Sequence, residues 1–170
     1  MKLMIASDIH GSAYWCERLM EKFREEVPGR LLLLGDILYH GPRNDLPREY
    51  APKRVAEILN SISEKLLCVR GNCDSEVDQM MLDFPIMADY CMIYDGEREI
   101  FATHGHKYSP ENPPKLSENA VLLCGHTHIS DDRSVGNFRY MNPGSVSIPK
   151  GGTSHGYMIY EDGNFAFKTL

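Results

Sequence analysis

The chain has 170 residues, a formal net charge of −6, and ordinary proportions of hydrophobic (42%) and charged (25%) residues. The acidic balance argues against an extended nucleic-acid surface and against an anionic membrane as partners. It leaves room for a small phosphate ester whose charge is offset by bound cations. No apolar run approaches the ~18 residues of a membrane span. These bulk properties indicate an ordinary globular protein.

Length and cysteine content favour one domain in a reducing compartment. A chain of this size buries roughly two-thirds of its unfolded surface, so it needs neither disulfides nor a structural metal to fold. Its five cysteines are an odd number without Cys-x-x-Cys spacing, and the apolar residues before Asp8 are too few for a signal peptide. We expect a single domain over residues 1–170, located in the cytoplasm.

Three β-α units are predicted in the first half of the chain, and each strand ends at polar residues. Helices are expected after Ser12, at Pro52 and near Ser75, where capping residues and helical apolar spacing support them. Parallel α/β sheets bind ligands beyond the carboxyl ends of their strands, so this edge is the expected place for a site. The strands span residues 2–7, 31–34 and 66–70, and they end at Asp8-Ile9-His10, Gly35-Asp36 and Gly71-Asn72-Cys73-Asp74.

The second half of the chain reads as β structure. The strand expected at residues 97–103 ends at His104, and the strand expected at residues 120–124 ends at Gly125-His126-Thr127-His128. The imidazoles of His104, His126 and His128 therefore also follow strand ends. A further strand is expected at residues 86–94, with hairpin turns at Asp95-Gly96, Gly136-Asn137 and Asp162-Gly163.

Seven side chains at these strand ends have the chemistry of a metal site. In an extended segment residues i and i+2 project to the same face, so Asp8 and His10 can reach a common point. Imidazole mixed with carboxylate suits Mn, Fe, Ni or Zn better than Ca or Mg, and the lack of thiolates argues against a structural zinc. The candidate ligands are Asp8, His10, Asp36, Asn72, His104, His126 and His128.

The ordered motifs Asp-x-His, Gly-Asp, Gly-Asn, His and Gly-His-x-His resemble those of the calcineurin-like metallophosphoesterase superfamily. Residues 40–44, 69–79 and 142–152 are also similar to the bacterial YfcE-type phosphodiesterases. The resemblance implies an α/β fold, a four-layer α/β/β/α sandwich, with two divalent metals at one edge of the sheets. It implies that Asp8, His10 and His128 bind the first metal, that Asn72, His104 and His126 bind the second, and that Asp36 bridges both.

The activity implied by this resemblance is hydrolysis of a small phosphodiester by a hydroxide that bridges the two metals. Manganese is the expected cofactor, and Ni²⁺, Fe²⁺, Co²⁺ and Zn²⁺ are the alternatives. Such a centre lowers the pKa of water towards ~7 and stabilises charge on the phosphoryl oxygens. Asn72, Cys73 and His104 are the candidate catalytic residues. Arg43 is the candidate for holding a phosphate oxygen, and a solvated loop arginine is its alternative role.

Cys73 occupies a position where many relatives have a histidine that assists the leaving group. A thiol donates hydrogen bonds weakly and has an unperturbed pKa near 8.5. Esters with good leaving groups, such as aryl phosphodiesters, are therefore expected to react best. The alternative is that Cys73 is a small apolar filler without a chemical role.

Two other functions are compatible with the same fold. One is a catalytically weak scaffold or binding module, like the retromer subunit that resembles this fold; the complete ligand set favours an enzyme. The other is a phosphomonoesterase, whose relatives usually keep the histidine at the position of Cys73. The natural substrate, cyclic nucleotides included, and the metal used in the cell stay open, and the resemblance adds a homo-oligomer as an expected assembly.

Overall fold

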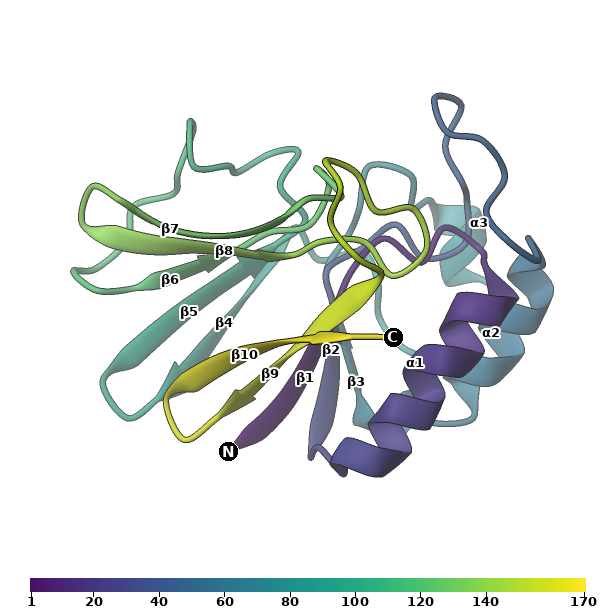
Figure 1. The fold of residues 1–170 in the computed structure, drawn as a ribbon, viewed down its shortest axis with the longest axis horizontal. Helices are drawn as coiled ribbons and strands as arrows, with labels where there is room; N and C mark the ends of the chain where they lie inside the picture. The colour runs from purple at the N-terminus through teal and green to yellow at the C-terminus, as the bar shows by residue number, and fades with distance from the viewer.

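Two mixed five-stranded sheets pack face to face in the computed structural model, which describes residues 1–170 (Figure 1). In the first sheet β1, β2 and β3 run parallel, whereas β9 and β10 are added in antiparallel fashion. The three predicted β-α units are therefore present and share one sheet. From edge to edge its strands are β10 (Asn164–Thr169), β9 (Gly156–Glu161), β1 (Lys2–Ala6), β2 (Arg30–Leu33) and β3 (Leu66–Cys68).

In the second sheet the central strands β5, β6 and β8 run parallel, and the hairpin partners β4 and β7 form its edges. The predicted strand at residues 86–94 forms only from Tyr90, because its partner β5 ends opposite that residue at Thr103. In edge order the strands are β4 (Tyr90–Asp95), β5 (Arg98–Thr103), β6 (Val121–Leu123), β8 (Phe138–Pro143) and β7 (Ser130–Val135).

The hairpin turns follow the sequence signals with one shift of register. Asp95 pairs with Arg98, so the first turn is Gly96-Glu97 rather than the expected Asp95-Gly96. The turns at Gly136-Asn137 and Asp162-Gly163 are confirmed by the pairs that flank them. Two-residue turns of this kind fix the register of the strands that they join.

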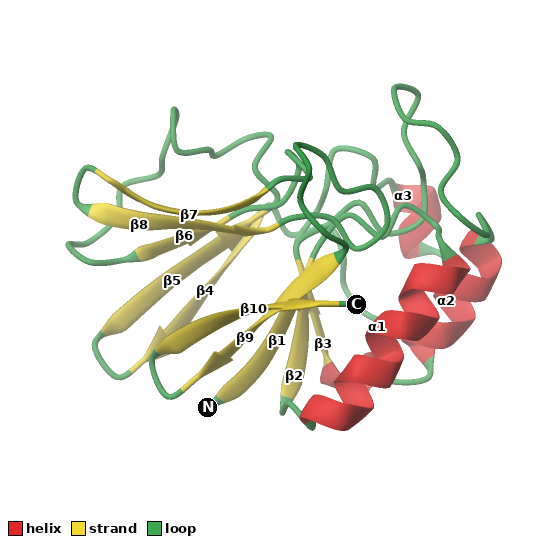
Figure 2. Cartoon of the chain, in the orientation of Figure 1, coloured by secondary structure: helices red, strands yellow, loops and turns green.

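The helices α1 (Ala13–Glu26) and α2 (Pro52–Asn60) cover the outer face of the first sheet, and the short α3 (Glu76–Gln79) lies beside them (Figure 2). The predicted helix starts are confirmed. The Ser12 hydroxyl accepts a hydrogen bond from the Trp15 N–H, and Ser75 forms a reciprocal capping box with Asp78. A single 3-10 turn, η1 (Ser63–Lys65), leads into β3. No helix has the length and apolar character needed to cross a bilayer.

Alternate residues of the strands feed two separate apolar layers. Leu31 and Leu33 face the helices, whereas Leu3 and Leu32 belong to the layer between the two sheets. A third cluster, which includes Leu122, covers the outer face of the second sheet. This alternation fixes the direction in which each strand end presents its polar residues.

The outer face of the second sheet is covered without a helix. The segment 104–119 lies over it, and Tyr108 and Leu116 pack against the apolar cluster there. Prolines at positions 110, 113 and 114 remove backbone donors and disfavour helical conformation. The α/β sandwich is thus confirmed, with this irregular segment in the place of an outer helical layer.

Candidate metal centre

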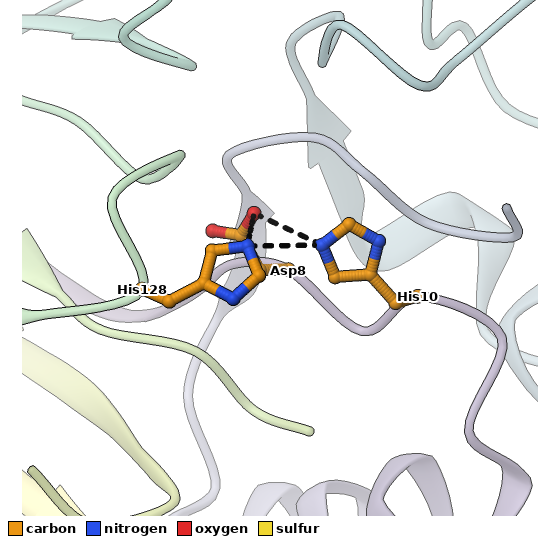
Figure 3. A group of neighbouring side chains, drawn as sticks. All are labelled: Asp8, His10 and His128. Carbon is orange, nitrogen blue, oxygen red and sulfur yellow. Dashed lines mark hydrogen bonds and ion pairs between the residues drawn. The ribbon is translucent and has the colours of Figure 1, made fainter. Parts of the chain in front are cut away.

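Three of the predicted ligands converge beyond the ends of β1 and β6. Asp8 Oδ1 lies 3.4 Å from His10 Nε2 and 3.2 Å from His128 Nε2, and the two imidazole nitrogens are 3.1 Å apart (Figure 3). All three side chains are buried. The other carboxylate oxygen of Asp8 accepts hydrogen bonds from Ser7 Oγ and the His126 N–H, whereas Oδ1 has no hydrogen-bond partner. A buried carboxylate oxygen facing two imidazoles needs a cation.

The remaining predicted ligands form a second group that adjoins the first. His104 Nε2 lies 3.0 Å from Asn72 Oδ1 and 3.2 Å from His126 Nδ1. Asp36 sits between the groups, because its Oδ2 is 3.4 Å from His104 Nε2 and 3.6 Å from His10 Nε2. Its Oδ1 accepts a hydrogen bond from the Cys73 N–H. One oxygen of Asp36 is therefore held by the backbone, and the other is shared between both groups.

Backbone carbonyls fix the tautomers of three imidazoles. The Nδ1–H groups of His10, His104 and His128 donate to the carbonyls of Tyr39, Leu34 and Ile148, at 2.7–2.8 Å. A carbonyl can only accept, so in the neutral rings Nδ1 carries the proton and Nε2 presents a lone pair. Metal-ligating histidines are commonly oriented by such bonds. The donor set therefore fits divalent cations at both groups.

The ligand-bearing turns adopt a backbone conformation that side chains usually avoid. Asp8, His10, Asp36, His126 and His128 all have positive φ, between 49° and 66°. This region costs non-glycine residues roughly 1–2 kcal/mol each. Strain of this kind clusters at functional sites, where the surrounding structure holds it in place.

Two glycines let the turns approach one another. A Cβ atom on Gly71 would lie 2.0 Å from Asp36 Oδ1, and one on Gly125 would lie 1.9 Å from Ser7 Oγ. No side chain can be accommodated at such distances. The glycines in the Gly-Asn and Gly-His motifs are therefore needed for close packing of the ligand loops.

The carboxylates and imidazoles of the site perturb one another strongly. Burial lowers the pKa of His104, but Asp36 and Asp8 outweigh it and raise that pKa to about 9. Burial raises the pKa of Asp8, yet its contacts with His10 and His128 bring it well below the ordinary value. The site thus gathers negative charge that positive charge must offset, and bound divalent cations would provide that neutralisation.

Asp74 clamps two ligand turns together, a role that the motif alone did not reveal. Its carboxylate accepts hydrogen bonds from the N–H groups of Asp36 (2.8 Å), Ile37 (2.9 Å) and Gly71 (2.7 Å). The side chain is buried, and burial raises the pKa of Asp74. The fourth residue of the Gly-Asn-Cys-Asp sequence therefore joins the turn after β2 to the turn after β3.

Asn142 plays a similar part at the other end of the site. Its Nδ2 donates to the Gly125 carbonyl (2.7 Å) and to Thr127 Oγ1 (3.1 Å), and its Oδ1 accepts from the Gly144 N–H. The next turn continues this support, since Ser145 Oγ donates to the Asp8 carbonyl. The end of β8 and the turn after it thus brace the loops that carry Asp8, His126 and His128.

We expect Asn142→Ala to weaken metal binding by about tenfold or more, because the loop carrying His126 and His128 loses its brace. The measurement is the manganese concentration at which half of the binding capacity of chelator-treated protein is filled. Asn137→Ala, at an exposed hairpin turn, is the matched control and is expected to behave like the parent. Equal half-saturating manganese concentrations for both variants would contradict the assigned role.

A polar cavity of about 440 Å³ opens over the ligands. Asp36, Asn72, Cys73, His126 and His128 contribute to its walls. Arg43, the predicted phosphate-binding residue, lines it as well, and so does Lys150, which the sequence analysis did not single out. In the sequence, Lys150 is visible only as a basic residue within the stretch 142–152. The positively charged side chains of Arg43 and Lys150 beside the ligand cluster suit an anionic ester.

A family model for the calcineurin-like phosphoesterase superfamily domain matches residues 1–163. The chain belongs to this superfamily. It is therefore a hydrolase of phosphate esters, and its clustered Asp and His side chains are suited to divalent metal ions.

Similar proteins are found among curated proteins and solved structures. Phosphodiesterase YfcE of Escherichia coli K12 is 53% identical over 162 residues, which cover 95% of this chain and 88% of the relative. The structure of YfcE, described as a phosphoesterase from E. coli, matches with a TM-score of 0.93 at 51% identity, covering 95% and 89% of the two chains. Vps29 of Entamoeba histolytica, solved with zinc, matches with a TM-score of 0.62 at 16% identity, covering 99% and 97%. This last likeness shows the fold alone.

Proposed function

We propose that the protein is a metal-dependent phosphodiesterase that acts on small diesters with good leaving groups. The observation that carries the proposal is the convergence of Asp8 Oδ1 and Asp36 Oδ2 on imidazole nitrogens, at 3.2–3.6 Å, beneath a polar cavity. The 53% identity to phosphodiesterase YfcE supports the choice of a diester.

In this proposal the two ligand groups hold two divalent cations. Two divalent cations, when bound, would supply a nucleophilic water of lowered pKa and offset charge on the phosphoryl group. In the chain itself, Asp36 would be shared between the two cations, because its Oδ2 lies between His10 and His104. One cation would take Asp8, His10 and His128, and the other Asn72, His104 and His126.

The side chains around the ligands would position the substrate. Arg43 and Lys150 line the polar cavity and would attract the anionic ester, with Arg43 able to hold a phosphate oxygen by two parallel hydrogen bonds. Asn72 is neutral, so it would act as a ligand and hydrogen-bond donor and would not remove protons. Positioning and charge stabilisation supply most of the rate enhancement in phosphoryl transfer.

The metal, the location, the domain organisation and the assembly of the protein are also part of the proposal. Manganese is the proposed metal, since imidazole and carboxylate ligands suit it and Ni²⁺, Fe²⁺, Co²⁺ or Zn²⁺ compete through availability. The cytoplasm is the proposed location, supported by five free cysteines. Residues 1–170 would act as one unit, because residues from Asp8 to Lys150 meet at one site, and association into a homo-oligomer is compatible with it.

Hydrolysis of bis-p-nitrophenyl phosphate and p-nitrophenyl phosphate tests the proposal. The protein is stripped with a chelator and then given manganese, nickel, cobalt or zinc in turn. We expect manganese-dependent turnover of the diester and much weaker turnover of the monoester. No turnover of either ester with any of these metals would contradict the proposal and leave a binding scaffold as the function.

Cys73 provides a further test of substrate range. The thiol is half-buried at the wall of the polar cavity, and burial together with Asp36 raises the pKa of Cys73 to about 12. Two diesters are compared: ethyl p-nitrophenyl phosphate, which has a good leaving group, and diethyl phosphate, which has a poorer one. We expect Cys73→His to increase turnover of diethyl phosphate by about tenfold or more. Product release is measured for both esters, and Cys73→Ser is the control. Unchanged turnover of diethyl phosphate would mean that Cys73 is only a filler.

A further inference from the structure

A second, apolar cavity lies beside the polar one, and Cys73 lines both. It measures about 410 Å³, within the range of small-molecule sites. Its walls come from the loop between β2 and α2, the start of α2, the turn after β3, and α3 with the residues that follow it. The apolar wall residues are Leu38, Tyr39, Tyr50, Pro52, Val77 and Met81.

Several of these apolar wall residues are more exposed to solvent than large apolar side chains packed in a core. The exposed fraction is 41% for Tyr39, 69% for Val77 and 45% for Met81. Large apolar side chains gathered at a concave surface mark a site that another molecule covers. Cys73, which the two cavities share, places this apolar surface next to the candidate metal centre.

The polar groups at the rim of this cavity are largely engaged within the protein. The Asp78 carboxylate accepts hydrogen bonds from the N–H and the hydroxyl of Ser75, both at 2.8 Å. The cavity therefore presents two phenol rings and aliphatic or thioether side chains to its occupant, together with Lys53, whose ammonium group forms no ion pair within the protein. Flat rings are favoured by such walls, because tyrosine stacks on aromatic groups and methionine sulfur contacts ring edges.

We propose that the apolar cavity is the subsite for one ester group of the substrate and that it selects diesters that carry an aromatic ring. The inference rests on the proposed phosphodiesterase activity and adds to it the chemical class of the ester group. A diester whose phosphoryl group lies over Asp36 and Asn72 reaches the cavity by extending one ester group past Cys73. Tyr39, Val77 and Met81 then determine specificity, and none of them is a candidate metal ligand.

Competition by non-chromogenic diesters tests the subsite, and the constants are taken from initial rates, before the competing diester is consumed. Manganese-loaded enzyme hydrolyses bis-p-nitrophenyl phosphate in the presence of diphenyl phosphate or diethyl phosphate, and the two inhibition constants are compared. We expect the parent protein to bind diphenyl phosphate about tenfold more tightly or better. The double variant Val77→Thr/Met81→Gln is expected to lose about fivefold of that preference, and Tyr39→Ala, in the loop after β2, to lose a similar factor.

Met80→Gln is the matched control, because Met80 is 84% exposed, adjoins Met81 and does not line the cavity. It is expected to leave both inhibition constants unchanged. Equal inhibition constants for the two diesters in the parent protein, or no change in the double variant and in Tyr39→Ala, would overturn the inference. Light scattering checks whether the patch instead joins two copies: a parent oligomer that the double variant dissociates, with inhibition unchanged, would also overturn it. Absence of turnover in the parent protein would count against the proposed function itself.

Discussion

Asp36→Asn is expected to lower kcat/KM for bis-p-nitrophenyl phosphate by about a thousandfold or more. Asp36 is the one carboxylate that lies within 4.0 Å of imidazole nitrogens in both ligand groups, with Oδ2 3.6 Å from His10 Nε2 and 3.4 Å from His104 Nε2. The amide can present only one neutral oxygen, so it cannot offset the repulsion between two cations as a carboxylate does. The loss is therefore expected in kcat as well as in the metal requirement.

The measurement is a manganese titration of activity, with the number of bound manganese ions determined on the same protein after gel filtration. Asp45→Asn is the matched control, since Asp45 is an exposed residue in the loop after Asp36 and is expected to leave both quantities unchanged. Circular dichroism melting establishes that the Asp36 variant is folded. Retention of full activity by Asp36→Asn would show that the two ligand groups do not share this carboxylate.

Asp74→Ala is expected to lower the free energy of unfolding by about 3–5 kcal/mol and to abolish activity. The alanine leaves three buried N–H groups, those of Asp36, Ile37 and Gly71, without their acceptor, and each such group costs roughly 1–3 kcal/mol. Activity falls with stability because the same bonds hold Asp36 in place. Asp74→Asn is expected to lie between the parent and the alanine variant, since its amide keeps one of the two acceptor oxygens.

Urea unfolding of chelator-treated protein gives the stability change without a contribution from bound metal. Asp83→Ala, at an exposed position, is the control for removal of a carboxylate. A stability loss below about 1 kcal/mol for Asp74→Ala would mean that water replaces the carboxylate and that the clamp is not needed.

The strand ends and the residues that follow them were predictable because two independent signals coincide there. Each apolar run stops at a motif that contains Asp, Asn or His, and the sheet topology then gathers those motifs at one edge. The structure accordingly brings Asp8, His10 and His128 together, and places Asp36 beside His104. Their service as metal ligands stays a prediction that the manganese measurements test.

Other features could not be read from the sequence because they depend on contacts between distant segments. Asp74 stands in a recognisable motif, but only the structure shows that its carboxylate joins two turns. Lys150 enters the polar cavity from a stretch more than a hundred residues after Asp36. An irregular segment covers the second sheet where the resemblance predicted a helical layer. The prolines between positions 110 and 114 disfavour a helix there.

The positive φ angles of the ligand residues set stability and activity against one another during evolution. Asp8, His10, Asp36, His126 and His128 each hold a conformation that glycine or asparagine would adopt at lower cost. A lineage that no longer needed hydrolysis would gain stability by replacing these residues, so relaxed selection would erode the ligand set before it disturbed the sandwich. The same five positions are therefore those where replacement by glycine or asparagine is expected to stabilise the fold while removing the ligand set.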